Sequence, residues 1–100
     1  MERKVTMKTM LDILKERLPE GLEIIKTKHR TGASQMEILF KYDGTEQKGW
    51  LQTVCAPGYA EKNCDFTIAA VMIGIGFDRN DREMIVKWKE IQNKALHTDE

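Results

Sequence analysis

Residues 35–43, QMEILFKYD, decide the fold class of this chain. Apolar and polar side chains alternate along the segment, a period that is typical of a β-strand with one buried face and one solvated face. The residues predicted on the buried face are Met36, Ile38, Phe40 and Tyr42. The residues predicted on the solvated face are Glu37, Leu39 and Lys41. The segment therefore predicts a strand that leaves one of its faces to water.

Two further strands are predicted next to this one. Residues 22–30, LEIIKTKHR, lead into it through the turn sequence TGAS, and residues 47–55, QKGWLQTVC, follow it after the turn sequence DGT. Connections this short join neighbouring strands in antiparallel order. The sequence thus predicts a three-stranded antiparallel meander, and a sheet of this kind can keep one face solvated.

Amphipathic helices are predicted before and after the strands. In the first helix, Thr6 is a candidate N-cap and residues 19–21, PEG, end the pattern. Its apolar stripe consists of Met7, Met10, Leu11, Leu14 and Leu18. In the last helix, Asn80 and Glu83 form a variant of the capping box at the start. Its apolar stripe consists of Met84, Ile85, Trp88, Ile91, Ala95 and Leu96.

The segment between the sheet and the last helix is apolar on every side. Residues 65–77, DFTIAAVMIGIGF, follow a loop-like stretch at residues 56–63, APGYAEKN. All-round apolarity predicts burial, while alanine and methionine favour helix and β-branched residues favour strand. We predict a helix over residues 67–75 that ends with Gly74 and Gly76 as its C-cap. The alternative is a strand, which would add a fourth member to the sheet.

Together these elements predict an α+β fold in a single domain over residues 1–100. The predicted order is α-β-β-β-α-α, with the helices packed on one face of the sheet. The chain resembles double-stranded-RNA-binding domains in the order α-β-β-β-α, but those domains carry lysines at the start of the helix after the sheet. Residues 64–71 read CDFTIAAV at that position. The resemblance is therefore limited to element order and implies no RNA-binding function.

The composition is that of an ordinary globular protein. Sixteen basic residues balance sixteen acidic ones, so the whole molecule has no field that would attract nucleic acid or an anionic membrane. The longest apolar run, residues 67–77, is much shorter than the roughly 20 residues that a membrane span needs. The first residues do not read as a secretory signal. A soluble, cytoplasmic protein without membrane contact is expected.

Residues 74–83, GIGFDRNDRE, are the stretch that looks most like a ligand site. A phosphate loop needs Lys followed by Ser or Thr after its glycines, and Phe77 and Asp78 stand there instead. A calcium loop alternates its oxygen ligands, whereas Arg79 and Arg82 interrupt the carboxylates here. A polar residue also stands where a helix-turn-helix requires an apolar one. The stretch is therefore interpreted as the joint between two helices.

The two cysteines, Cys55 and Cys64, do not form a metal-binding motif. Eight residues separate them, which is not a zinc-knuckle spacing, and His29 and His97 are the only histidines. No paired carboxylates, catalytic triad or phosphate loop is recognisable. We therefore expect a protein that is not an enzyme, with no catalytic residues, no metal and no cofactor.

The first predicted hairpin is the one surface with a functional pattern. Basic residues gather near its turn without an acidic neighbour, namely Lys26, Lys28, His29 and Arg30. Residues 32–34, GAS, are small and allow the turn to approach a partner closely. The residues expected beside it on the solvated face of the sheet are Leu39, Lys41, Lys48 and Trp50. These eight residues form the candidate binding surface.

The sequence favours a small non-catalytic binding or regulatory protein, such as an inhibitor or accessory factor, that acts by contact with another protein. Leu39, Trp50 and the edge strand are the expected contact, and a homodimer is one form that such contact takes. The alternative is a nucleic-acid-binding protein. In that case the basic hairpin would grip phosphates and Trp50 would stack on a base.

Overall fold

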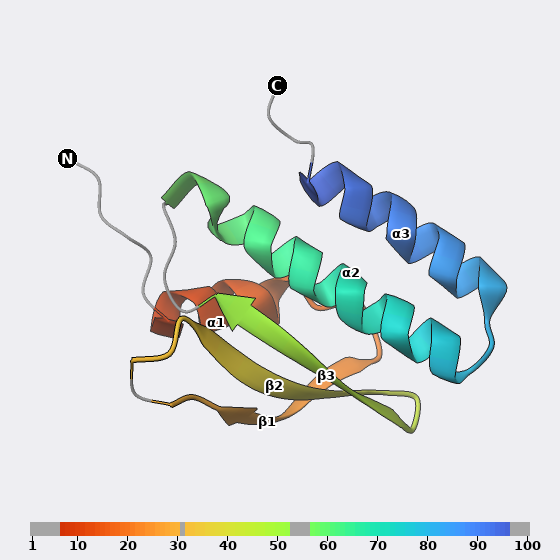
Figure 1. Ribbon diagram of the computed structural model, residues 1–100, viewed down its shortest axis with the longest axis horizontal. Coiled ribbons are helices and arrows are strands. Elements are labelled where there is room, and N and C mark those ends of the chain that lie inside the picture. The colour runs from red at the N-terminus through yellow and green to blue at the C-terminus, as the bar shows by residue number, and fades with distance from the viewer. Residues whose placement is uncertain (1–6, 31, 53–56, 97–100) are drawn as a thin grey trace.

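The computed structural model describes residues 7–30, 32–52 and 57–96 of the chain (Figure 1). Its elements are α1 (Met7–Arg17), β1 (Leu22–Lys28), β2 (Gln35–Tyr42), β3 (Thr45–Gln52), the short 3₁₀ helix η1 (Pro57–Tyr59), α2 (Ala60–Asp78) and α3 (Arg82–Leu96). This order confirms the predicted α+β fold, α-β-β-β-α-α. Thr6, Cys55, His97 and the side chains of Met7 and Leu96, all named above, lie outside the described residues.

The sheet has the order β1-β2-β3 and both strand pairs are antiparallel, as the short connections between the strands predicted. Tyr42 and Thr45 face each other across a two-residue turn, in which Asp43 and Gly44 have φ angles of 48° and 85°. Positive φ at both central residues is the requirement of a type I′ hairpin turn, which Asp-Gly meets readily. The turn sequence therefore sets the register of β2 against β3.

One face of the sheet carries the hydrophobic core. α1 and α2 cover this face, and α3 packs on the far side of α2 (Figure 1). The buried residues are Met10 and Leu14 from α1, Leu22, Met36, Ile38, Phe40 and Leu51 from the strands, and Ala60, Cys64, Ile68, Val71, Met72 and Ile75 from α2. The helices thus occupy one side of the sheet, as predicted. We call the opposite side the open face.

α2 approaches the sheet closely at Gly49 in the middle of β3. A Cβ atom at this position would lie 2.5 Å from Cγ2 of Val71 and 2.9 Å from Cε1 of Phe40. Contacts this short are far inside the van der Waals distance of two carbon atoms, so only glycine fits between the helix and Phe40. Gly49 therefore determines how deeply α2 sits on the sheet.

Residues 67–75 are helical as predicted, but both predicted ends of this helix are wrong. α2 begins at Ala60, within the stretch that was expected to be a loop, and it continues through Gly74 and Gly76 to Asp78. The two glycines serve packing. A Cβ at Gly74 would lie 2.8 Å from Cδ of Gln47, and a Cβ at Gly76 would lie 2.8 Å from Cγ1 of Ile85. They let β3 and α3 approach α2.

The helix ends at Asp78 with Arg79 as its C-cap, and the next residue, Asn80, has a φ of 55°. The backbone N–H of Asn80 donates to the carbonyl of Phe77 (3.1 Å), and that of Asp81 donates to the carbonyl of Gly76 (2.8 Å). These two bonds define a Schellman motif with Asn80 as its left-handed residue. The prediction that Asn80 is the N-cap of α3 is therefore wrong. That role belongs to Asp81, whose Oδ1 accepts the N–H of Met84 at 3.1 Å.

Candidate functional site

The open face of the sheet is organised in rows of three residues, because side chains that face each other across antiparallel strands point to the same side. The first row, next to the β1–β2 turn, is Lys28, Glu37 and Trp50. The second row is Lys26, Leu39 and Lys48. The third row, at the opposite end, is Glu23, Lys41 and Glu46. Basic residues and an aromatic ring thus concentrate at one end of the face.

A bulge in β1 places the two lysines on this face. Leu22 and Ile24 point into the core, so regular alternation would also turn Lys26 and Lys28 inward. The register shifts between Ile24 and Lys26, and the additional residue, Ile25, is 45% exposed. A bulge of one residue exchanges the faces of all residues that follow it in the strand. The irregularity is therefore what makes this end of the sheet basic.

Trp50 is the most prominent apolar group on the open face, with 51% of its surface exposed. Its backbone is held from the other side of the sheet, because the buried Thr67 of α2 donates from Oγ1 to the carbonyl oxygen of Trp50 at 2.9 Å. The hydrogen bond satisfies a carbonyl at the outer edge of β3. The strand is thus anchored while the indole ring stays accessible.

Two adjoining pockets surround the rows next to the turn. One, of about 600 Å³, lies between the β1–β2 turn and Trp50 and includes Lys28, Arg30 and Glu37. The other, of about 250 Å³, includes Lys26, Leu39 and Lys48 and shares Lys28 and Glu37 with the first. We call the two together the hairpin pocket. The hairpin pocket contains the exposed ring of Trp50, the apolar side chain of Leu39 and a rim of basic residues.

The charge of the hairpin pocket is predominantly positive. Its cations are Lys26, Lys28, Arg30 and Lys48. Its single carboxylate, Glu37, lies 3.5 Å from the ammonium group of Lys48, which offsets part of that charge. All four cations belong to exposed residues, so their field is screened by salt and acts over about 10 Å at moderate ionic strength. The pocket therefore suits an anionic group that comes into direct contact.

Six of the eight predicted surface residues come together in this pocket, and two do not. His29 lies at the turn, where its Nε2 is 3.1 Å from the carbonyl oxygen of Ala33. Ala33 also donates its N–H to the carbonyl of Arg30 at 3.0 Å. His29 therefore contacts the turn itself and does not line the pocket. Lys41 belongs to the third row, between Glu23 and Glu46. Sequence reasoning missed Glu37, although the alternation of residues 35–43 already placed it on the same face as Leu39.

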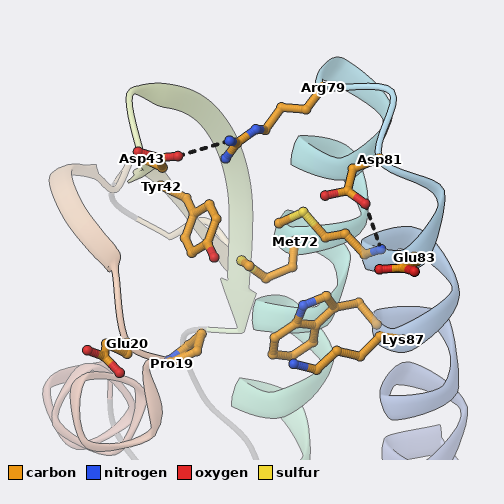
Figure 2. A pocket seen from close by; sticks show the side chains of 11 residues that line it. Pro19, Glu20, Tyr42, Asp43, Met72, Arg79, Asp81, Glu83 and Lys87 are labelled. Carbon is orange, nitrogen blue, oxygen red and sulfur yellow. Dashed lines mark hydrogen bonds and ion pairs between the residues drawn. The ribbon is translucent and has the colours of Figure 1, made fainter.

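A second cleft, of about 480 Å³, lies between the sheet and the α2–α3 hairpin (Figure 2). Figure 2 shows Arg79 reaching from the end of α2 to Asp43 in the β2–β3 turn. The Nη2–Oδ2 distance is 2.9 Å, and the guanidinium lies 5.7 Å from the centre of the Tyr42 ring. Asp81, which also lines the cleft, caps α3. These polar groups tie the helical hairpin to the sheet.

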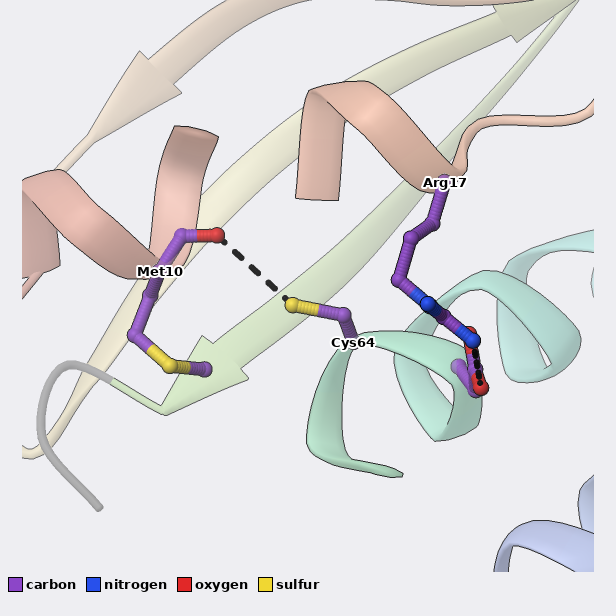
Figure 3. A network of polar contacts seen from close by, with 4 residues as sticks. Met10, Arg17 and Cys64 are labelled. Carbon is purple, nitrogen blue, oxygen red and sulfur yellow. Dashed lines mark hydrogen bonds and ion pairs between the residues drawn. The ribbon is translucent and has the colours of Figure 1, made fainter. Parts of the chain in front are cut away.

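α1 is attached to α2 by two polar contacts (Figure 3). The Cys64 thiol donates to the carbonyl oxygen of Met10 at 3.6 Å, and Cys64 is fully buried. Arg17 donates from Nε and Nη2 to the two carboxylate oxygens of Asp65, at 2.7 and 2.9 Å. These hydrogen bonds raise the pKa of Arg17 above its ordinary value. Both contacts serve packing, and Cys64 offers no surface to a substrate.

Within residues 7–30, 32–52 and 57–96, no group of three His, Cys, Asp or Glu side chains is arranged to hold a metal ion. In the same part of the chain, no helix combines the length and the apolarity that crossing a membrane requires. Comparison with known proteins finds no matching family model, no similar curated protein and no similar solved structure. The geometry of the surface is therefore the basis for a functional assignment.

Proposed function

We propose that this chain is a non-catalytic binding protein that holds an acidic segment of another protein against the open face of its sheet, as an inhibitor or accessory factor would. The observation that carries the proposal is the half-exposed Trp50 beside Lys28 and Arg30 in one pocket. Tryptophan and arginine are the residues most enriched among those that dominate binding energy at protein interfaces. An apolar side chain of the partner would pack on Trp50 while its carboxylates meet the basic rim.

The distribution of charge favours a short acidic segment. Glu37 stands within the pocket, and Glu23 and Glu46 flank the far end of the open face. A nucleic-acid backbone that crossed the whole sheet would bring its phosphates against these carboxylates, at a cost in repulsion. A peptide with one apolar anchor and a few carboxylates needs only the hairpin pocket.

Single-stranded nucleic acid is the second candidate, because an exposed ring among cations is also the arrangement that stacks on a base. Stacking on an aromatic side chain contributes about 1–3 kcal/mol per base and tolerates any sequence. In this case Lys28 and Arg30 would contact the two phosphates next to the base stacked on Trp50. A short single strand that contacted only the hairpin pocket would not meet the carboxylates of the third row, Glu23 and Glu46.

The first test is to purify the protein from its native cells and to examine one sample by absorbance at 260 nm and by mass spectrometry. Fluorescence anisotropy then measures the binding of two labelled probes, an acidic peptide with one leucine and a short oligothymidylate. We expect the peptide to bind more tightly. Trp50→Ala should weaken binding at least tenfold, and Lys28→Glu/Arg30→Glu should abolish it.

Lys15→Glu/Lys94→Glu is the matched control, because it changes the net charge equally at exposed positions on α1 and α3. The control should bind as the unchanged protein does. Equal losses in both double variants would mean that net charge, and not the pocket, governs binding. Tighter binding of the oligonucleotide, with an affinity that falls steeply as salt rises, would establish the second candidate in place of the first.

A further inference from the structure

α2 exposes a stripe of apolar side chains on the side that turns away from the core. The stripe consists of Phe66, Ala70, Ile73 and Phe77, and Phe66 and Phe77 are 37% and 61% exposed. A helix that is apolar on all sides is normally buried on all sides. α2 is such a helix, yet one of its sides lacks a cover in the described part of the chain. Apolar surface of this kind marks an interaction site.

The stripe lies on a broad side of a flattened molecule. The molecule measures 45 × 33 × 20 Å, and in the view along its shortest axis α2 runs between β3 and α3 (Figure 1). On the α3 side, Val86 is 52% exposed and the Lys89 ammonium lies 5.7 Å from the centre of the Phe77 ring. On the β3 side, Phe66 and Ala70 line a pocket of about 330 Å³ together with Gln47, Lys48 and Trp50.

The spacing of the stripe is the same in both directions. The steps from Phe66 to Ala70, Ile73 and Phe77 are four, three and four residues. Two antiparallel copies of α2 related by a two-fold axis therefore place Phe66 opposite Phe77 and Ala70 opposite Ile73. A two-fold interface requires this kind of self-complementary pattern, in which each residue meets its counterpart twice. Ala70 gives the larger Ile73 of the other copy room at the centre.

The direction of the helices favours the same arrangement. Antiparallel α2 helices place the positive end of each helix dipole beside the negative end of the other.

The area of the stripe is adequate for a dimer. The exposed parts of the four residues and Val86 amount to roughly 350 Å² per copy, judged from the 150–250 Å² of a large aromatic side chain. Two copies would bury roughly 700 Å² of apolar surface, and a specific interface needs about 1,000 Å² in total. The polar rim with Lys62 and Lys89 supplies the remainder.

We propose that the chain forms a two-fold symmetric dimer through antiparallel packing of the α2 stripes of two copies. The dimer interface adjoins the hairpin pocket, because Trp50 and Lys48 line the same pocket as Phe66 and Ala70. Self-association and peptide binding are measured separately, so each proposal can fail without the other.

Sedimentation equilibrium of the full chain tests the dimer. The protein should sediment at twice its mass of 11.6 kDa at high concentration. Phe77→Glu should weaken self-association at least a hundredfold, with an unchanged circular dichroism spectrum because Phe77 is largely exposed. Ile25→Glu is the matched control, since Ile25 is 45% exposed on β1 and should leave the dimer intact. A monomer at all concentrations, or equal effects of both variants, would overturn the proposal.

Disulfide trapping tests the antiparallel register in a Cys55→Ser background, where the remaining Cys64 is fully buried. Phe66→Cys/Phe77→Cys should form an intermolecular disulfide on oxidation. Phe66→Cys alone should not, because the two copies of residue 66 would lie about 16 Å apart along the helix axis. Equally efficient cross-linking of the single variant would contradict the antiparallel arrangement.

Discussion

Gly49 and Trp50 are neighbours in β3, yet they face opposite sides of the sheet and obey different constraints. Gly49 is buried under α2, where even one methyl group would overlap with Val71. The side chain of Trp50 is half exposed on the open face, and only its backbone carbonyl is held, by Thr67. The comparison separates residues whose identity maintains the fold from residues whose side chains are available to a partner.

The largest contrast is expected between Leu51 and Trp50. Leu51 is fully buried in the core, so Leu51→Ala should lower the free energy of unfolding by about 2–5 kcal/mol through lost burial and a cavity. Trp50→Ala removes the larger side chain but should cost less than about 1 kcal/mol, as substitutions on exposed surfaces do. Urea denaturation measures both. Comparable losses would show that the Trp50 ring belongs to the core.

A smaller contrast is expected between two glycines. Gly49→Ala forces a Cβ to within 2.5 Å of Val71, and overpacking of this kind should lower the free energy of unfolding by about 1–3 kcal/mol. A Cβ at Gly58 meets no atom within 4 Å, so Gly58→Ala should change the free energy by less than about 0.5 kcal/mol. A neutral Gly49→Ala would mean that α2 can move away from the sheet without cost.

The two faces also differ in how far the sequence predicts them. The inner face of β2 follows directly from the alternation of Met36, Ile38 and Phe40, because a strand with one buried face has no other way to arrange them. The Asp-Gly turn then sets the register of β3, and with it the placement of Lys48 and Trp50 on the open face. The local sequence pattern was sufficient to assign these side chains to a face, because strand geometry allows only one arrangement of them.

Local pattern failed where distant contacts determine the structure. Gly74 and Gly76 read as a helix end, but Gln47 and Ile85 pack on them from other elements, and no local pattern reveals such neighbours. The bulge at Ile25 is a similar case. It carries Lys26 and Lys28 to the open face, while their spacing from Ile24 would place them inside. Half of the basic rim of the hairpin pocket thus depends on a backbone irregularity that the sequence pattern does not predict.

The hydrogen bond from Thr67 to Trp50 connects the two faces of the sheet. Its removal is the smallest change that tests whether α2 on the inner face affects binding at the open face. Thr67→Val keeps the shape of the side chain but leaves the carbonyl of Trp50 without this donor, which should lower the free energy of unfolding by about 1 kcal/mol. Thr67→Ser retains the hydroxyl and is the matched control. If α2 positions Trp50 through this bond, the valine variant binds the acidic peptide more weakly than the serine variant, measured by anisotropy. Equal affinities would show that the indole finds its place on the open face without help from the helix beneath it.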